Sequence, residues 1–251
     1  MNPPERRPVS PSLRDAWPDD EVHLWKIQLD WPESVLARFR RDLSVEEQQR
    51  ADRFVFDKHR RRYVVAHGAM RSVLSRYLGC DPRQVEYQTN SKGKPAIKPG
   101  LGDGILQFNL SHSEEVALLA VTQGRAVGVD LEQVREFSGR DGIVEKQFSA
   151  AEWEEFQRVP PPLRNEAFTL GWTRKEAFVK ALGEGLSCDL RAFSVSLTPG
   201  EEPRLVHIDP SLEGRGPWAL GHIDPEPGFC GALVVAGSGF VVRERVWSPE
   251  V

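Results

Sequence analysis

The sequence predicts an α+β protein of two similar lobes, each a small antiparallel sheet packed on one long helix. A long helical segment followed by polar turns and an apolar strand over 116–121 makes up the first half. The same order recurs in the second half, where a helix over 163–182 precedes an apolar run over 231–236. Each unit has a helix that covers one sheet face, so both units can bury a core in the same way. We therefore expect a disordered tail over 1–20, an N-terminal lobe over 21–125 and a C-terminal lobe over 126–247.

Residues 1–20 are rich in Pro, Arg and Asp without periodicity, which predicts the tail. The N-terminal lobe is therefore expected to begin after them, with a strand over 22–29. Ser44 and Glu47 form a capping box that starts a long helix, and Gly79 is a typical residue to end it. Apolar residues recur at helical spacing inside this helix and predict a buried stripe. Its members are Tyr63, Ala66, Met70, Val73, Leu74 and Tyr77. Short strands are expected near 85–87, 105–110 and 116–121.

The C-terminal lobe is expected to begin with a strand that contains Gly128-Val129-Asp130-Leu131-Glu132. Ser149 and Glu152 form a second capping box, and three prolines over 160–162 interrupt the helical pattern. A further helix over 163–182 ends at Gly183. Strands are expected over 193–197, 229–235 and 240–246.

Composition narrows the class of protein but not its activity. The chain has 251 residues, of which 39% are hydrophobic, and a net charge of −4. This charge argues against a nucleic-acid partner, although basic residues cluster over 59–62. The three cysteines have no C-x-x-C spacing, so neither a disulfide framework nor a zinc site is indicated. We find no apolar run long enough for a membrane span and no signal-peptide pattern, and we expect a cytoplasmic protein without a membrane partner.

Two segments carry acidic and basic side chains at spacings that suit phosphate chemistry. Asp130 and Glu132 alternate with apolar residues, so both project from one face of a strand. Glu176 and Lys180 are four residues apart and share one face of a helix, with Trp172 one turn before them. Each pattern alone is typical of a solvated face. If strand and helix meet, three carboxylates surround one hard divalent cation with an ammonium group beside it.

The motifs together resemble a known family. The strand GVDLE is followed by W-x-x-K-E-A-F-x-K-A-x-G-x-G-L, which runs from Trp172 to Leu186. Before them come Gly93-Lys94-Pro95 and Asn109-Leu110-Ser111-His112-Ser113. This set resembles the 4′-phosphopantetheinyl transferases of the surfactin-synthetase-activating type, from about Ser44 to Leu186. The resemblance implies two pseudo-symmetric lobes with the active site in the cleft between them.

The resemblance also implies an activity and a set of site residues. The activity is transfer of 4′-phosphopantetheine from coenzyme A to a serine of an apo acyl or peptidyl carrier protein, with Mg²⁺, or Mn²⁺ in its place. The implied metal ligands are Asp130, Glu132 and Glu176, and the implied catalytic residues are Glu176 and Lys180. The implied coenzyme A contacts are Arg50, Arg62, Lys94, Ser111, His112, Asp130, Glu176 and Lys180. Relatives carry a basic residue where this chain has Glu47, which leaves Arg50 one turn later as the phosphate contact. We expect a monomer.

Several alternatives stay open. A Mg²⁺-dependent nuclease or phosphohydrolase would use the same carboxylates but would not need the Gly-Lys-Pro and Ser-His-Ser elements. A non-catalytic binding module for coenzyme A or carrier protein would not need a metal site beside a base. Trp172 and Phe178 are expected in the core, since aromatic residues at helical spacing usually bury. Lys175 is either an exposed charge or a second phosphate contact. The base for the serine is Glu176 or a metal-bound water, and the type of carrier protein is open.

Overall fold

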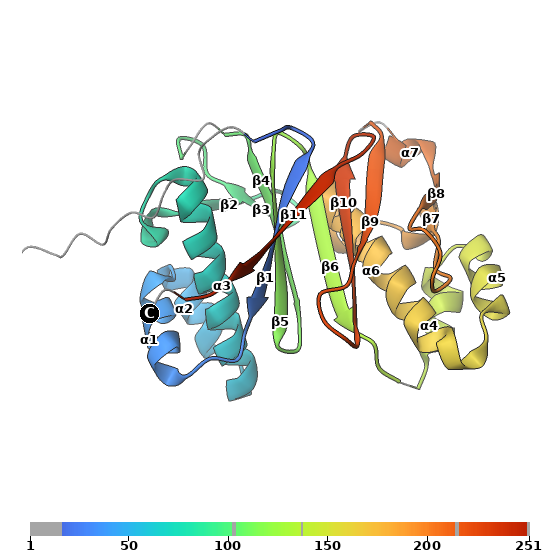
Figure 1. Cartoon of the computed structure of the whole chain (residues 1–251), viewed down its shortest axis with the longest axis horizontal. Coiled ribbons are helices and arrows are strands. Elements are labelled where there is room, and N and C mark those ends of the chain that lie inside the picture. The colour runs from blue at the N-terminus through green and yellow to red at the C-terminus, as the bar shows by residue number, and fades with distance from the viewer. Residues whose placement is uncertain (1–16, 102–103, 137, 214–215, 250–251) are drawn as a thin grey trace, which may run out of the picture.

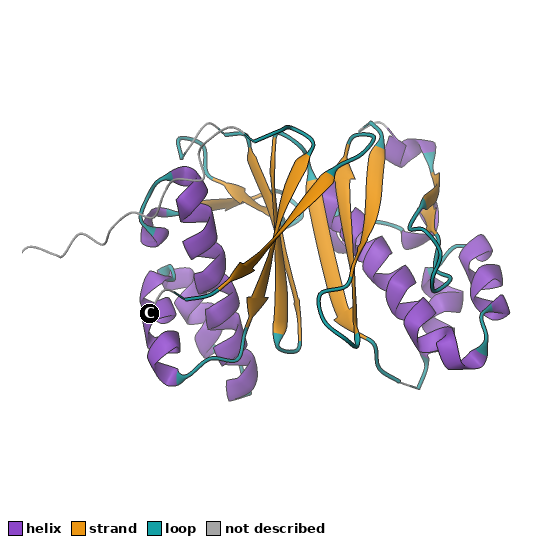
Figure 2. Ribbon diagram, in the orientation of Figure 1, coloured by secondary structure: helices purple, strands orange, loops and turns teal. Residues whose placement is uncertain are grey.

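The computed structural model describes residues 17–101, 104–136, 138–213 and 216–249. It is an α+β fold in four main layers, with helices on the outside and two sheets packed face to face in the middle (Figure 1, Figure 2). The predicted fold class is confirmed. Most of the predicted tail lies outside the described residues. Trp17, within the predicted tail, stacks on His23 with ring centroids 4.3 Å apart.

The first lobe places three helices against one face of its sheet. Its longest helix, α3, has 22 residues, and the predicted stripe on it is buried against the sheet. Gly79 ends α3 with φ of 64°, as its position predicted. The elements are β1 (Glu21–Gln28), α1 (Glu33–Asp42), α2 (Val45–Asp52), α3 (Asp57–Leu78), β2 (Tyr87–Thr89), β3 (Pro95–Ile97), β4 (Leu106–Ser113) and β5 (Val116–Gln123).

The single long helix predicted from Ser44 to Gly79 is wrong, because the chain breaks between α2 and α3. The capping box at Ser44 and Glu47 starts α2 as predicted. Residues 53–56 then leave the helix. Phe54, Val55 and Phe56 are poor helix formers in succession, and Phe54 turns to pack on Tyr63 with ring centroids 5.3 Å apart.

The second lobe packs α6, 19 residues long, across its sheet, and smaller elements cover α6. The second capping box, at Ser149 and Glu152, is present at the start of α5. The helices are α4 (Arg140–Gln147), α5 (Ala150–Arg158), α6 (Arg164–Leu182) and α7 (Pro210–Glu213), with short 3₁₀ turns at Gly185–Ser187 and Leu190–Ala192. The strands are β6 (Val127–Gln133), β7 (Phe193–Val195), β8 (Leu205–Ile208), β9 (Trp218–Ile223), β10 (Phe229–Ala236) and β11 (Val241–Trp247).

The lobes meet sheet against sheet. The two larger sheets have the strand orders β11-β1-β5-β4 and β6-β10-β9, and β2 with β3 and β7 with β8 form two-stranded sheets. Alternate residues of β5 and β6 form the core between the sheets, including Leu118, Val129 and Leu131. The intervening residues of β6 face α6, which confirms that Asp130 and Glu132 project from one face while Val129 and Leu131 turn into the core.

The last strand differs from the expectation, which assigned residues 126–247 to the second lobe. β11 crosses back to the first lobe (Figure 1) and pairs in parallel with β1, from Glu21 beside Val241 to Ile27 beside Trp247. The first sheet is therefore mixed rather than purely antiparallel. Side chains stabilise this register, because Arg243 Nε donates to Glu21 Oε2 at 3.0 Å and Trp247 packs on Phe39 in the first core. Among the described helices, none combines the length and apolarity needed to span a bilayer.

Candidate active site at the junction of the lobes

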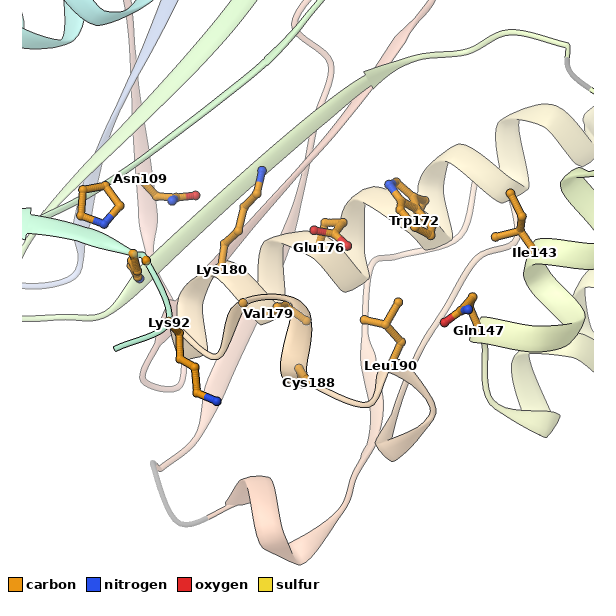
Figure 3. Close-up of a pocket in the computed structure, with 15 residues that line it drawn as sticks. Lys92, Asn109, Ile143, Gln147, Trp172, Glu176, Val179, Lys180, Cys188 and Leu190 are labelled. Atoms are coloured by element: carbon orange, nitrogen blue, oxygen red, sulfur yellow. The ribbon is translucent and has the colours of Figure 1, made fainter. Parts of the chain in front are cut away.

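A cavity of about 660 Å³ opens where α6 meets the first lobe. Trp172, Glu176 and Lys180 rise from the same side of α6 into this region (Figure 3). The other lining residues come from the β2–β3 hairpin, β4, α4, α6 itself and the segment after α6. They are Lys92, Gly93, Lys94, Pro95, Asn109, Ile143, Gln147, Val179, Gly183, Gly185, Cys188 and Leu190. The site thus draws on both lobes, as the sequence predicted.

The strand β6 lies directly against α6, whose side chains line this cavity, because a glycine lets strand and helix approach closely. A Cβ atom built on Gly128 would lie 2.1 Å from the Ala177 carbonyl oxygen and 2.4 Å from the Ala181 nitrogen. Any side chain there would push strand and helix apart. Gly128 therefore sets the short distance between the strand that carries Asp130 and the helix that carries Glu176.

Asp130, Lys180 and Ser111 form the tightest polar contact of the site. Lys180 Nζ lies 2.6 Å from Asp130 Oδ1 and 3.0 Å from Ser111 Oγ, and the serine hydroxyl donates to the same Asp130 oxygen at 2.7 Å. Asp130 Oδ2 is buried and has no hydrogen-bond partner among the described residues. A buried carboxylate oxygen without a partner is rare, and an ion is one of its ordinary explanations.

The three predicted metal ligands influence one another electrostatically. Burial raises the pKa of the Asp130 carboxyl, against the opposing effect of Lys180. Burial also raises the pKa values of Glu132 and Glu176, and the charge of Asp130 raises both further. Glu132 is held by Ser113, whose hydroxyl donates to Oε2 at 2.7 Å. Burial, and after it the charge of Asp130 on the two glutamates, therefore disfavours the ionised carboxyl groups, and a bound cation would favour them.

These carboxylates suit a divalent cation in their chemistry but not in their present spacing. Their oxygens are the donors that Mg²⁺ prefers, and the free Oδ2 of Asp130 is available. Within the described parts of the chain, however, no three His, Cys, Asp or Glu side chains stand in a group that could hold a metal ion. The donor chemistry therefore fits Mg²⁺, while the side chains would have to move closer together to bind it.

Arg62, predicted to grip a phosphate, is occupied by carboxylates. Its side chain is 7% exposed, and the guanidinium binds Asp30 in a bidentate pair at 2.8 and 2.7 Å. Its Nη1 donates to Glu114 Oε2 at 2.9 Å, and Glu115 lies 3.5 Å away. Arg62 thus ties α3 to the end of β1 and to the β4–β5 turn, and in this arrangement it has no free side for a phosphate.

The remaining predicted contacts are Lys94, His112 and Arg50. Lys94 Nζ donates to the carbonyl oxygens of Val127 and Ala181 at 2.9 and 3.3 Å, so it joins β6 and the end of α6 rather than pointing into open space. Burial lowers the pKa of this ammonium group to about 8.

His112 projects from the face of β4 opposite to Ser111. The imidazole is exposed in part, yet desolvation by its neighbours lowers its pKa, as do nearby cations that include Lys180. Arg50 stacks on Tyr63, 5.7 Å from the ring centre.

Two family comparisons match the chain in succession. Residues 32–124 match the family described as 4′-phosphopantetheinyl transferase, N-terminal, and residues 126–224 match the 4′-phosphopantetheinyl transferase superfamily. The chain is also 39% identical over 231 residues to the 4′-phosphopantetheinyl transferase HetI of Nostoc sp., which covers 92% of this chain and 91% of that protein. The chain belongs to the 4′-phosphopantetheinyl transferase family.

Other members of the transferase family are more distant. The 4′-phosphopantetheinyl transferase Sfp of Bacillus subtilis is 31% identical over 221 residues, with 87% of this chain and 94% of that protein covered. The human L-aminoadipate-semialdehyde dehydrogenase-phosphopantetheinyl transferase is 27% identical over 168 residues, which span 63% of this chain and 54% of that protein.

In this transferase, α6 buries Phe178 and Lys175 but leaves Trp172 partly exposed. Phe178 is fully buried, as predicted, whereas Trp172 is only partly buried and lines the cavity. Lys175 is neither an exposed charge nor a phosphate contact, so both alternatives are wrong. Its side chain is fully buried and paired with Glu152 at 2.8 Å. Sequence patterns do not mark a lysine for burial, because lysine is almost always exposed unless it is paired.

Asn109 and Ser113 were not among the predicted site residues, yet both make polar contacts in the site. Asn109 accepts a hydrogen bond from the Val129 nitrogen at 2.8 Å, and Ser113 holds Glu132. Both lie on the same face of β4 as Ser111, two residues to either side. The alternation of Asn109, Ser111 and Ser113 along a strand was the available signal. In the transferase these side chains join the edge of the first sheet to β6.

Proposed function

We propose that this transferase moves the 4′-phosphopantetheine part of coenzyme A to a serine of an apo acyl or peptidyl carrier protein. Adenosine 3′,5′-bisphosphate is the second product. The observation that carries the proposal is the contact of Lys180 with Asp130 and Ser111, where α6, β6 and β4 meet beside the cavity. The names of the relatives agree with this activity.

The reaction requires one bond to form and one to break at phosphorus. The oxygen of the carrier serine attacks the phosphorus on the pantetheine side of the diphosphate. The bond from that phosphorus to the bridging oxygen breaks, and adenosine 3′,5′-bisphosphate leaves with the electron pair. The serine proton passes to a base. Glu176 is our choice, because it lines the cavity and its raised pKa makes it a better proton acceptor than an ordinary carboxylate.

Lys180 and Asp130 have separate tasks in this proposal. Lys180 lies one turn beyond Glu176 and carries the positive charge that stabilises the departing phosphate. Asp130 and Ser111 hold its ammonium group in place. Asp130, Glu132 and Glu176 would hold Mg²⁺, or Mn²⁺ in its place. When bound, the ion supplies a Lewis acid for the diphosphate oxygens.

Coenzyme A is the substrate, and we propose that Arg50, Arg62, Lys94, Ser111 and His112 contact it. Support differs among them. Ser111 lies in the polar contact beside the cavity and Lys94 lines the cavity, whereas a phosphate would have to replace the carboxylates that now surround Arg62. We further propose a monomer, since both halves of the site come from one chain. The resemblance of the motifs supports the surfactin-synthetase-activating subtype, and we also propose a cytoplasmic location.

A mass measurement tests the proposal. The protein is incubated with coenzyme A, Mg²⁺ and a panel of apo carrier proteins of the fatty-acid, polyketide and peptide-synthetase types. Each accepted carrier should gain one phosphopantetheinyl group, and a carrier whose acceptor serine is replaced by alanine should gain none. Binding of coenzyme A without any mass gain on any carrier would instead favour a binding module.

A further inference from the structure

Lys175 directly precedes Glu176 on α6 yet takes no part in the cavity. Its side chain is fully buried, and Nζ lies 2.8 Å from Glu152 Oε2. The same nitrogen donates to the carbonyl oxygens of Leu190 and Phe193, both at 2.7 Å. An ammonium group has three donors, and these three acceptors use all of them. No donor remains for a substrate phosphate.

Glu152 connects this cation to two further elements. Its side chain is 1% exposed. One carboxylate oxygen accepts from the Val195 nitrogen at 2.8 Å, and the other accepts from the Ser149 nitrogen at 2.7 Å. The pair of Lys175 and Glu152 therefore joins α6 to the start of α5 and to β7. Through Leu190, which lines the cavity, it also fixes one wall of the site.

The neighbouring residue on α6 makes the same kind of contact. Arg174 is buried, and its Nη1 donates to the Ser196 carbonyl oxygen at 2.7 Å and to the Ser196 hydroxyl at 3.1 Å. Successive residues of a helix point about 100° apart. Because Arg174 and Lys175 are both anchored to segment 190–196, the rotation of α6 about its own axis is fixed. Glu176 is then directed into the cavity.

Stability alone does not account for a buried ion pair at this place. Removing a lysine and a glutamate from water is costly, and well-packed apolar residues of similar size are often as stable or more so. Charged groups add directional bonds, here to two particular carbonyl oxygens. These bonds define the position of the helix more narrowly than apolar contacts do.

We propose that Lys175, through its buried pair with Glu152, is a positioning residue of the transferase. It sets the rotation of α6 and the wall at Leu190, so that Glu176 and Lys180 face Asp130. Lys175 itself touches no substrate. This inference rests on the proposed transferase function.

The test compares variants that separate stability from turnover. Lys175→Met removes the charge and leaves Glu152 buried without its partner. Lys175→Met combined with Glu152→Gln removes both charges, while the glutamine oxygen still accepts from one backbone nitrogen. Lys175→Arg keeps the charge. Lys98→Met is the matched control, since Lys98 pairs with Glu86 on the surface, where its side chain is 56% exposed.

Thermal unfolding is measured first, and kcat and KM for coenzyme A are then measured at a temperature at which each variant is folded. Lys175→Met should unfold at a lower temperature, and the double variant should recover much of that loss. Both should retain KM for coenzyme A while kcat falls about 10-fold or more, the scale expected when a reacting group is misplaced. Lys175→Arg should recover a large part of kcat, and Lys98→Met should match the unchanged chain.

Other outcomes overturn the inference. A folded variant without a cation at 175 that keeps the kcat of the unchanged chain excludes a positioning role. So does a double variant whose kcat returns together with its stability. If no neutral variant folds, the pair is a requirement for folding and not a device that positions Glu176. If the unchanged chain and Lys98→Met modify no carrier protein, the proposed function itself is wrong and the inference falls with it.

Discussion

Replacing Gly128 by alanine should separate β6 from α6 and thereby test the geometry on which the site depends. The added Cβ would lie 2.1 Å from the Ala177 carbonyl oxygen, whereas ordinary contact begins at 3.4 Å. Helix and strand must therefore move apart by about 1 Å, since both obstructing atoms belong to the backbone. Asp130 follows Gly128 by two residues, and Glu176 directly precedes Ala177. The same displacement should therefore increase the distance between the carboxylates of Asp130 and Glu176.

Two magnitudes follow from this displacement. Overpacking against a backbone should cost about 3 kcal/mol or more of the free energy of unfolding. For a chain of this size that lowers Tm by about 6 to 12 °C. A shift of about 1 Å among reacting groups should lower kcat by about 10²-fold.

Calorimetry and carrier-modification kinetics measure the two effects of Gly128→Ala. Gly142→Ala is the matched control, because Gly142 lies within α4 and a Cβ there would meet nothing within 4 Å. Alanine is the better helix former by about 1 kcal/mol, so this control should be as stable as the unchanged chain or more stable. If Gly128→Ala kept both the Tm and the kcat of the unchanged chain, the close approach of β6 to α6 would not be a feature of the protein.

Three further outcomes are expected. Glu176→Gln should lower kcat by about 10²-fold, the usual scale for a lost general base, while calorimetry shows coenzyme A binding retained; near-normal turnover would leave another group as the base. Chelation by EDTA should abolish transfer and added Mg²⁺ restore it, whereas full activity in excess EDTA would exclude the magnesium site at Asp130. Burial lowers the pKa of His23, so the folded chain binds fewer protons there than the unfolded chain, whose histidine titrates near about 6.5. The stabilising contribution of His23 should therefore be complete above this pH and be lost as the pH falls below it. Urea midpoints measured against pH should fall less steeply on the acid side for His23→Gln than for the unchanged chain, and equal slopes for the two chains would contradict this reasoning.

Local patterns predicted the elements that carry the site. The alternation around Asp130 and Glu132 gave a strand with the correct faces, and the spacing of Glu176 and Lys180 gave a helix within one residue of its observed ends. Both depend on interactions between near neighbours in the chain, which a sequence pattern contains. The two capping boxes were predicted for the same reason.

Contacts between distant segments were not contained in such patterns. Burial of Lys175 depends on Glu152 and on backbone carbonyl oxygens that only the folded chain brings together. The Gly-Lys-Pro turn also does not show that β6 and α6 offer backbone acceptors to the ammonium group of Lys94. A strand pattern likewise does not specify its partner, so the pairing of β11 with β1 could not be predicted from residues 241–247 alone.

The path of β11 has a consequence for how the chain reaches its native state. This strand follows the other strands and helices of both lobes in sequence, so the first sheet lacks an outer strand until residues 241–247 have been synthesised. A fragment that ends near residue 125 would leave the backbone N–H and C=O groups of β1 unpaired along an open edge, which invites association with other chains. The two halves resemble each other in architecture, yet the first sheet includes a strand from the end of the second half. A split version of this enzyme should therefore keep residues 241–247 with the first half, either fused or supplied as a separate peptide.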